Sequence, residues 1–331
     1  MIRRLLNGVR DRMLSAPWRA VLLMAVFAGM AVAASRHGLL EAAELTTLVA
    51  GEPAITRIAS TTNGQVVRGL VAGGGIVAIE PSAAAVPREV VAPAGRGECR
   101  AIGCLPGDVT AVVVNAGDAW FLRTYRVKPS GAVSADAPLQ EIPLGQSTGS
   151  GDDVGIAVSR ARGWLAIVGL PAPLPPVVRA AVAGVRIGPV SDRGCPKLGD
   201  GLRPVAATVG PFDELVLAVQ WEGEPPEIAY FDASGRELLR LPAALEGITG
   251  LEMGSEDGLL WATGGDADGG EGLWRLDAGL QQGRQVIRPT LVAPLAVPVA
   301  LACCSPRAII VVHGATPTMT LVNPLTTGDS E

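Results

Sequence analysis

The chain has 331 residues, of which 4% are aromatic and 18% charged, and its formal net charge is −5. Glycine and proline account for 42 and 26 residues, a proportion that argues against a helical protein and is typical of short strands joined by turns. A mildly acidic chain without a basic stripe excludes nucleic acid as the expected partner, and with only His37 and His313 a histidine-built metal site is nearly excluded as well.

The N-terminal segment has the composition of a targeting sequence. Residues 20–34 are apolar and uncharged, and five arginines precede them. Small residues near the end of this run predict a signal peptide cleaved after about Ala33. The arginine-rich leader also fits an uncleaved signal anchor that crosses the membrane with residues 17–36, and a buried core helix is the third alternative. We expect residues 1–38 to be the signal peptide or signal anchor, with one hydrophobic helix, and residues 39–331 to form a separate domain outside the cytoplasm, in the periplasm or at the cell exterior.

Five cysteines fit an oxidising compartment. Cys99 and Cys104 flank a stretch that we interpret as a short loop, which a disulfide would close. Cys303 and Cys304 are adjacent, so a vicinal disulfide between them is possible but strained. Cys195 is then the one cysteine for which the sequence suggests no disulfide partner. The alternative is that some of these are buried thiols, packed as small apolar residues. None has the CxxC spacing of a zinc or redox site.

From residue 45 onward, short apolar runs alternate with Gly, Pro, Asp or Ser, which predicts strands and turns. The clearest unit, residues 204–241, contains four such runs and predicts one blade of a β-propeller. The sequence motif at Ile228–Gly235 recurs at Leu273–Gly279 and, loosely, at Met319–Pro324. Its polar turn residue lies at positions 232, 277 and 323, which are 45 and 46 residues apart. A fixed period of this size indicates one supersecondary unit copied around an axis.

The second strands of the predicted units give a count of six, with five or seven as alternatives. They begin near Val66, Val109, Trp164, Leu215, Leu259 and Ile309. The last unit has no room for a fourth strand, whereas a spare strand lies at Glu44–Ala50. We predict that this strand completes the last blade, because pairing the two ends of the chain removes exposed sheet edges. The sequence therefore predicts an all-β propeller of six four-stranded blades.

The segment Ile228–Leu238 resembles the third strand, turn and fourth strand of bacterial secreted propellers of the YVTN, WD40-like and quinoprotein-like repeat families. The resemblance covers most of residues 45–328 and is weak in each repeat. No unit has the Trp-Asp pair of WD40 repeats or the tryptophan motif of quinone-cofactor repeats. The resemblance implies a propeller fold and no particular activity.

Acidic residues provide the candidate sites. In the loop that follows Gly265, the side chains of Asp266, Asp268 and Glu271 alternate with small residues and could bind calcium, although a solvated turn is the favoured interpretation. Further acids are expected in loops at the mouth of the channel, where they could hold a cation or act as acid and base, as in propeller lactonases. These are Asp152, Asp153, Asp213, Glu214 and Asp257.

Other motifs for catalysis are absent from the sequence. There is no GxSxG nucleophile elbow and no CxxCH haem site. The proline-rich stretch Leu170–Pro176 is a candidate contact arm, although an inert loop is the favoured interpretation. We expect a non-catalytic scaffold that binds a protein partner, in or near a membrane complex if residues 17–36 stay uncleaved. The alternative is a lactonase-type hydrolase with a cation, and no cofactor other than calcium is implied.

Overall fold

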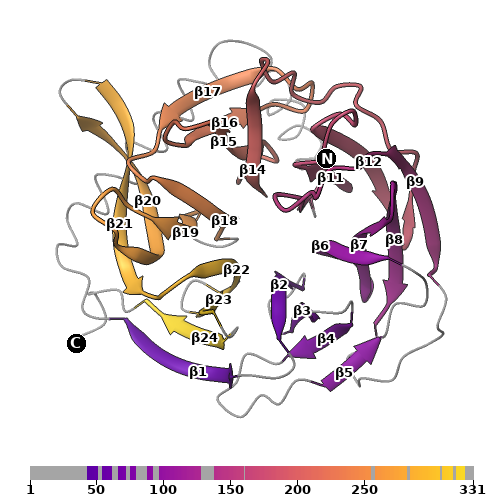
Figure 1. Ribbon diagram of the computed structural model, residues 1–331, viewed down its shortest axis with the longest axis horizontal. Coiled ribbons are helices and arrows are strands. Elements are labelled where there is room, and N and C mark those ends of the chain that lie inside the picture. The colour runs from indigo at the N-terminus through magenta and orange to yellow at the C-terminus, as the bar shows by residue number, and fades with distance from the viewer. Residues whose placement is uncertain are drawn as a thin grey trace, which may run out of the picture.

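The protein forms a ring of six sheets around a central channel (Figure 1). The computed structural model describes residues 43–50, 54–61, 66–71, 75–79, 88–91, 97–127, 138–159, 161–254, 258–281, 284–305, 308–315 and 318–324. Each sheet has four antiparallel strands. This is a six-bladed β-propeller, so the predicted fold class and blade number are confirmed. The predicted N-terminal hydrophobic segment lies outside the described residues, within which no helix is long and apolar enough to span a bilayer.

Blades 1 to 5 follow the chain in order, and the innermost strand of each comes first. Blade 1 contains β2 (Ile55–Ser60), β3 (Val67–Val71), β4 (Ile76–Ile79) and β5 (Arg88–Val91). Blade 2 contains β6 (Glu98–Leu105), β7 (Val109–Ala116), β8 (Ala119–Arg126) and β9 (Gln140–Gln146). Blade 3 contains β10 (Gly155–Ser159), β11 (Trp164–Val168), β12 (Val177–Ala183) and β13 (Arg186–Ile187). Blade 4 contains β14 (Leu202–Val209), β15 (Leu215–Trp221), β16 (Glu227–Phe231) and β17 (Glu237–Pro242). Blade 5 contains β18 (Gly247–Met253), β19 (Leu260–Gly265), β20 (Glu271–Gln281) and β21 (Arg284–Pro294).

Blade 6 joins the two ends of the described chain. Its strands β22 (Pro298–Ser305), β23 (Ala308–His313) and β24 (Thr318–Asn323) are completed by β1 (Glu44–Ala50). In the antiparallel pairing of β1 with β24, Glu44 lies opposite Asn323 and Thr46 opposite Leu321. The predicted closing strand is therefore confirmed with its boundaries. Figure 1 shows β1 on the outer rim beside β24, where it covers the edge that β24 would otherwise expose.

The core lies between neighbouring blades. The second strands carry the longest buried runs, such as Leu215–Val219 and Val109–Val114, in which every residue is buried. A strand that packs against another sheet on both faces needs apolar side chains at successive positions, and this is why the second strands read as continuous apolar runs in the sequence. Between blades 4 and 5 the packing includes Tyr230 and Trp274. Few aromatic residues are enough to form this core, because each interface between two blades is small and the same kind of interface is repeated around the ring.

A one-residue β-bulge recurs near the start of five of the six innermost strands. The pairing with the second strand shifts between Ile55 and Arg57, and at the corresponding places in β6, β14, β18 and β22. The extra residues are Thr56, Arg100, Val205, Thr249 and Val299. Bulges of this kind bend a strand and redirect side chains at the rim of a closed structure. The repeated bulges allow the innermost strands to be aligned by position.

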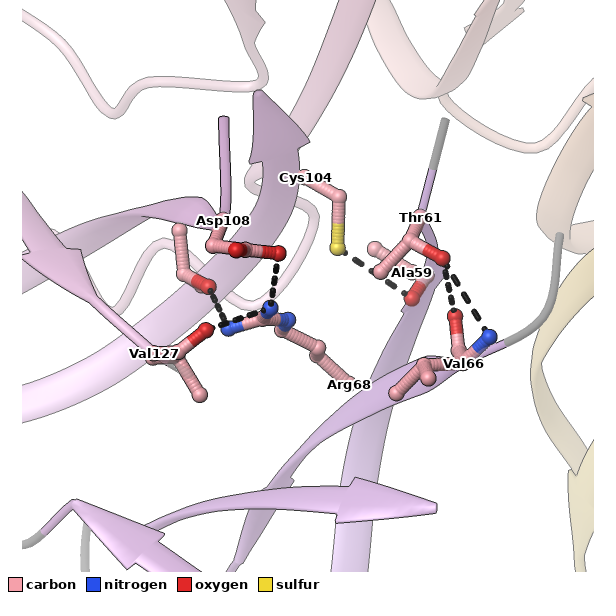
Figure 2. A network of polar contacts seen from close by, with 8 residues as sticks. Ala59, Thr61, Val66, Arg68, Cys104, Asp108 and Val127 are labelled. Atoms are coloured by element: carbon pink, nitrogen blue, oxygen red, sulfur yellow. Dashed lines mark hydrogen bonds and ion pairs between the residues drawn. The ribbon is translucent and has the colours of Figure 1, made fainter. Parts of the chain in front are cut away.

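A buried arginine connects blades 1 and 2 (Figure 2). Arg68 of β3 is 2% exposed, and its Nη1 and Nη2 groups donate hydrogen bonds to Thr110 Oγ1 at 3.0 Å and to the Val127 carbonyl at 2.8 Å. The carboxylate of Asp108 lies 3.8 Å from Nη2 and is half-exposed. Burial lowers the pKa of Arg68, and the negative charge of Asp108 offsets part of that effect. The guanidinium therefore holds the start of β7 and the end of β8 against the neighbouring blade.

The interpretation of the Cys99–Cys104 stretch as a loop closed by a disulfide is wrong. Cys99 and Cys104 both lie within strand β6, where five extended positions separate their Cα atoms by about 16 Å, far beyond the reach of a disulfide. All five cysteines are thiols in this structure, including the adjacent Cys303 and Cys304. In the proline-rich stretch, Leu174 packs against blade 2 and the Ala172 carbonyl accepts a hydrogen bond from Ser147, which favours the inert-loop interpretation over a contact arm.

Candidate functional site

The central channel contains two connected cavities of about 520 Å³ and 320 Å³. The larger cavity is lined by the final residues of the innermost strands and by the loop around Phe212, whereas the smaller one is lined by their first residues. We call these ends the carboxyl-terminal mouth and the amino-terminal mouth. The two cavities share one residue from each of blades 1 to 5: Ile58, Ile102, Ile156, Ala207 and Glu252.

The side chains of the channel form successive layers, with about one residue from each blade. The layer where the cavities meet is apolar and consists of Ile58, Ile102, Ile156, Ala207, Leu251 and Leu301, all of which line the smaller cavity. The residues of the next layer toward the carboxyl-terminal mouth are identified by aligning the innermost strands at their bulges. It consists of Ala59, Gly103, Ala157, Thr208, Glu252 and Ala302. Four of these are Ala or Gly and one is Thr, so Glu252 is the single charged side chain in a layer of small ones.

A network of charged groups surrounds the amino-terminal mouth. Arg57 donates a hydrogen bond to the Asp152 carbonyl at 2.9 Å, while Arg100 binds the Asp152 carboxylate at 3.0 Å and that of Glu98 at 2.7 Å. Burial lowers the pKa of Arg57, the carboxylates of Asp152 and Asp153 raise it, and the neighbouring Arg100 lowers it further. Asp152 therefore holds two arginines from neighbouring blades, Arg100 through its carboxylate and Arg57 through its backbone carbonyl.

The carboxyl-terminal mouth contains a second set of acids with internal partners. Asp213 accepts a hydrogen bond from the Ser159 hydroxyl at 2.7 Å and forms an ion pair with Arg162 at 3.1 Å. Glu214 is buried and accepts a hydrogen bond from the backbone N–H of Phe212 at 3.0 Å, which shapes the turn in which Asp213 has a φ of 64°. Both acids support the loop between β14 and β15.

The predicted acids do not gather at one place. Asp152 and Asp153 precede strand β10 and lie at the amino-terminal mouth, while Asp213 follows strand β14 and lines the cavity at the other mouth. The innermost strands all run in the same direction along the channel, so loops before and after them lie at opposite ends. Asp257 lies outside the described residues.

The acidic loop between β19 and β20 is stabilised by its own amides. One carboxylate oxygen of Asp266 accepts hydrogen bonds from the backbone N–H groups of Asp268 at 3.1 Å and Gly270 at 2.6 Å. Glu271 accepts one from the N–H of Val297 at 2.6 Å. Within the described residues no three acidic, histidine or cysteine side chains are placed to hold a metal ion. This arrangement is that of an Asx turn, which makes the solvated-turn interpretation the better supported one.

Sequence reasoning missed the two residues that give the channel its chemical character. Glu252 could not be recognised as a channel residue because one acidic residue in a strand such as β18 is not unusual. Phe212 could not be recognised because it lies in the turn between β14 and β15. The available signal was the alignment of the innermost strands, in which Glu252 occupies a position that other blades fill with Ala, Gly or Thr. That alignment requires the bulges, which the apolar pattern does not reveal.

Comparison with known proteins supports the fold alone. No family model matches the sequence, and no curated protein matches it. Among solved structures, the PQQ-bound aldose sugar dehydrogenase of Streptomyces coelicolor is 12% identical, with a TM-score of 0.55 over 86% of this chain and 99% of that one. A glucose dehydrogenase-type oxidoreductase of Thermus thermophilus is 14% identical, with a TM-score of 0.55 over 85% and 99% of the two chains. The β-propeller domain of Cps50 (Swd1) from Myceliophteria thermophila is 10% identical, with a TM-score of 0.50 over 86% and 100%. These likenesses show a β-propeller fold, as the repeat pattern predicted, and no particular activity.

Proposed function

We propose that this chain is a non-catalytic, protein-binding propeller that acts outside the cytoplasm. The observation that carries the proposal is the hairpin formed by β20 and β21, whose two strands are longer than the third and fourth strands described in the other blades. Each of its strands has 11 residues, whereas the third strands of the other described blades have between 4 and 8. Figure 1 shows this hairpin projecting beyond the ring at blade 5.

The hairpin is firmly attached at its base and exposed near its tip. Ile287 is 1% exposed, packs in the cluster that joins blades 4 and 5, and forms a parallel bridge with Ala243. Close to the tip, Leu280 lies opposite Gln285 and is 61% exposed. An arm that is pre-organised in this way loses little conformational entropy when it binds, which favours its use as a contact element. The neighbouring Arg284 and Arg288 are exposed and add charge.

The alternative predicted from the sequence, a lactonase-type hydrolase, has less support. Its acids would have to converge, yet those of the described loops lie at opposite mouths of the channel and bind arginines or backbone amides. A general base or a set of cation ligands requires oxygen atoms that face one common point. The extracytoplasmic location rests on the arginine-rich leader and the apolar residues 20–34.

The test uses cross-linking of the full chain in its native cells, with two variants that each place a charge at an exposed leucine. In Leu280→Asp the change lies on the hairpin, whereas Leu139→Asp is the matched control, since Leu139 is 45% exposed in another blade. We expect a partner that binds the purified wild-type chain saturably at 1:1, binds the control equally, and binds Leu280→Asp at least about ten-fold more weakly. Equal binding by both variants, or no stoichiometric partner, would refute the role of the hairpin.

A further inference from the structure

The outer part of the blade 5 hairpin is a two-stranded ribbon that continues beyond the rest of its sheet. Strand β19 pairs with β20 only as far as Leu276, which lies opposite Leu260. From residue 277 to 281, β20 pairs with β21, and within the described part of the chain no strand lies on its other side. The opposite edge of the ribbon is bridged, because Ile287 of β21 pairs with Ala243. We call residues 277–281 and 284–288 the outer hairpin, and its free edge is that of β20.

This free edge is suited to pairing with a strand of another chain. An unpaired strand edge presents backbone N–H and C=O groups, and proteins often protect such edges with proline, which has no N–H group. Strand β21 contains Pro289 and Pro294, whereas β20 contains no proline. The edge of β20 therefore keeps the donors and acceptors through which an added strand would bind.

The two faces of the outer hairpin differ in chemistry. Residues that lie directly opposite each other share a face, and successive residues of one strand point to opposite faces. Arg288 lies opposite Asp277 and Arg284 lies opposite Gln281, so both arginines are on one face. Leu280 lies on the other face and is 61% exposed. The outer hairpin thus has a basic face and an apolar face.

The basic face has the opposite charge to the chain as a whole. Asp277 forms an ion pair with Arg275 at 2.8 Å, so these two charges cancel. Arg284 and Arg288 are exposed, and neither forms an ion pair with a described residue. They add two positive charges to a chain whose net charge is −5. Complementary charge on a partner is therefore negative.

Gly279 allows Arg288 to reach across β20. A Cβ atom at Gly279 would lie 2.7 Å from Cδ and 2.9 Å from Nε of Arg288, so the arginine side chain lies directly over this glycine. Because Gly279 belongs to the strand with the free edge, a strand added beside β20 would come within reach of the guanidinium. A guanidinium binds carboxylates in a bidentate geometry that other cations do not offer.

We propose that the protein partner adds an extended strand, in which acidic and apolar residues alternate, to the free edge of β20. Its carboxylates lie on the face of Arg288 and Arg284, and its apolar side chains lie beside Leu280, because an added strand also directs successive side chains to opposite faces. The inference rests on the proposed function and names the chemistry of the partner segment. An anionic lipid surface would use the two charges and leave the strand edge unpaired.

The experiment measures binding between the purified full chain and the partner recovered by cross-linking. Arg288→Gln removes one charge of the basic face, and the matched control Arg186→Gln removes another exposed arginine, from β13 in blade 3. We expect Arg288→Gln to weaken binding about five-fold at low salt and less than about two-fold in about 0.5 M NaCl, since salt screens a charge pair at the surface. The control should bind like the wild-type chain.

Two further measurements separate strand addition from a general attraction between charges. Gly279→Val keeps every charge and displaces Arg288 from its place over β20, so it should also weaken binding about five-fold. In the complex, hydrogen exchange of the backbone amides at residues 277–281 should slow at least about ten-fold, because an added strand pairs with this edge. Exchange in β12 and β13 of blade 3 should not change.

The outcomes distinguish this inference from the proposed function. If Leu280→Asp weakens binding while Arg288→Gln does not, or if exchange at residues 277–281 is the same in the complex, the partner uses the hairpin and the acidic added strand is wrong. If no stoichiometric partner is recovered, both proposals fail. Sedimentation of the chain with phosphatidylglycerol vesicles that requires Arg288, and that is absent with phosphatidylcholine vesicles, would assign the basic face to lipid and overturn the inference.

Discussion

Replacing Arg68 by methionine should destabilise the ring at the junction of blades 1 and 2. The buried guanidinium donates to Thr110 Oγ1 at 3.0 Å and to the Val127 carbonyl at 2.8 Å, contacts that Figure 2 shows converging on one side chain. Methionine retains most of the volume and removes the donors, so a buried hydroxyl and a buried carbonyl lose their partner. Asp108 contributes little, because its carboxylate is half-exposed and 3.8 Å away.

The expected cost follows from these contacts. Each buried polar group that loses its partner costs about 1–3 kcal/mol, and Arg68→Met leaves two such groups. Part of this cost is offset, because the variant no longer has to bury a charged guanidinium. We therefore expect Arg68→Met to lower the free energy of unfolding by about 2–3 kcal/mol. Arg68→Ala should cost about 4–5 kcal/mol, because it also leaves a cavity. Asp108→Asn should cost less than about 1 kcal/mol.

Urea-induced unfolding followed by circular dichroism measures these differences as shifts of the midpoint at constant slope. Thr110→Val provides an internal check, because it removes one of the groups that Arg68→Met leaves without a partner. The double variant should cost about 1 kcal/mol less than the sum of the single variants. The reasoning is refuted if Arg68→Met unfolds at the wild-type midpoint, or if Asp108→Asn is as destabilising as Arg68→Met.

Three further measurements follow from the structure. Burial lowers the pKa of His313 in the folded state. Below a pH of about 6.5 the unfolded chain therefore binds more protons than the folded chain, so the free energy of unfolding should fall as the pH falls. His313→Gln should flatten this decline in pH-dependent unfolding curves. Burial raises the pKa of Cys99 and Cys195 to about 11, so at a pH of about 8 iodoacetamide should label them about 100-fold more slowly in the native chain than in guanidinium, and mass spectrometry showing equal rates would contradict their placement. Because Thr46 lies opposite Leu321, cysteines at these two positions should form a cross-link between β1 and β24 under mild oxidation, and a failure to cross-link would contradict the closure.

The blades and their closure could be predicted from the sequence because the signals are local. A second strand buried on both faces must be apolar at successive positions, as at Leu215–Val219, and a turn must contain residues such as Asp232 and Gly235. Asp232 accepts hydrogen bonds from the N–H groups of Ser234 and Arg236, which closes that turn. The spare strand Glu44–Ala50 was recognisable because the last unit lacked a fourth strand.

The interpretation of the Cys99–Cys104 stretch failed for a tertiary reason. Gly103 looks like a loop residue, yet it lies in strand β6 because a neighbouring blade approaches closely: a Cβ atom there would come within 2.6 Å of Ile156. The repeat likewise predicts a turn at Asp277, yet Asp277 lies within β20, opposite Arg288 of β21, so the β20–β21 hairpin is longer than the repeat indicates.

By itself, the sequence determined that the chain folds into six similar sheets whose ends meet, since each sheet is specified by its own apolar runs and turns. Only the tertiary structure decided which acids share a mouth of the channel, which arginines they bind, and that Glu252 lies among small side chains at its centre. The physical reason is that strand periodicity records burial within one blade, whereas the channel is formed by single residues from six blades that lie far apart along the chain.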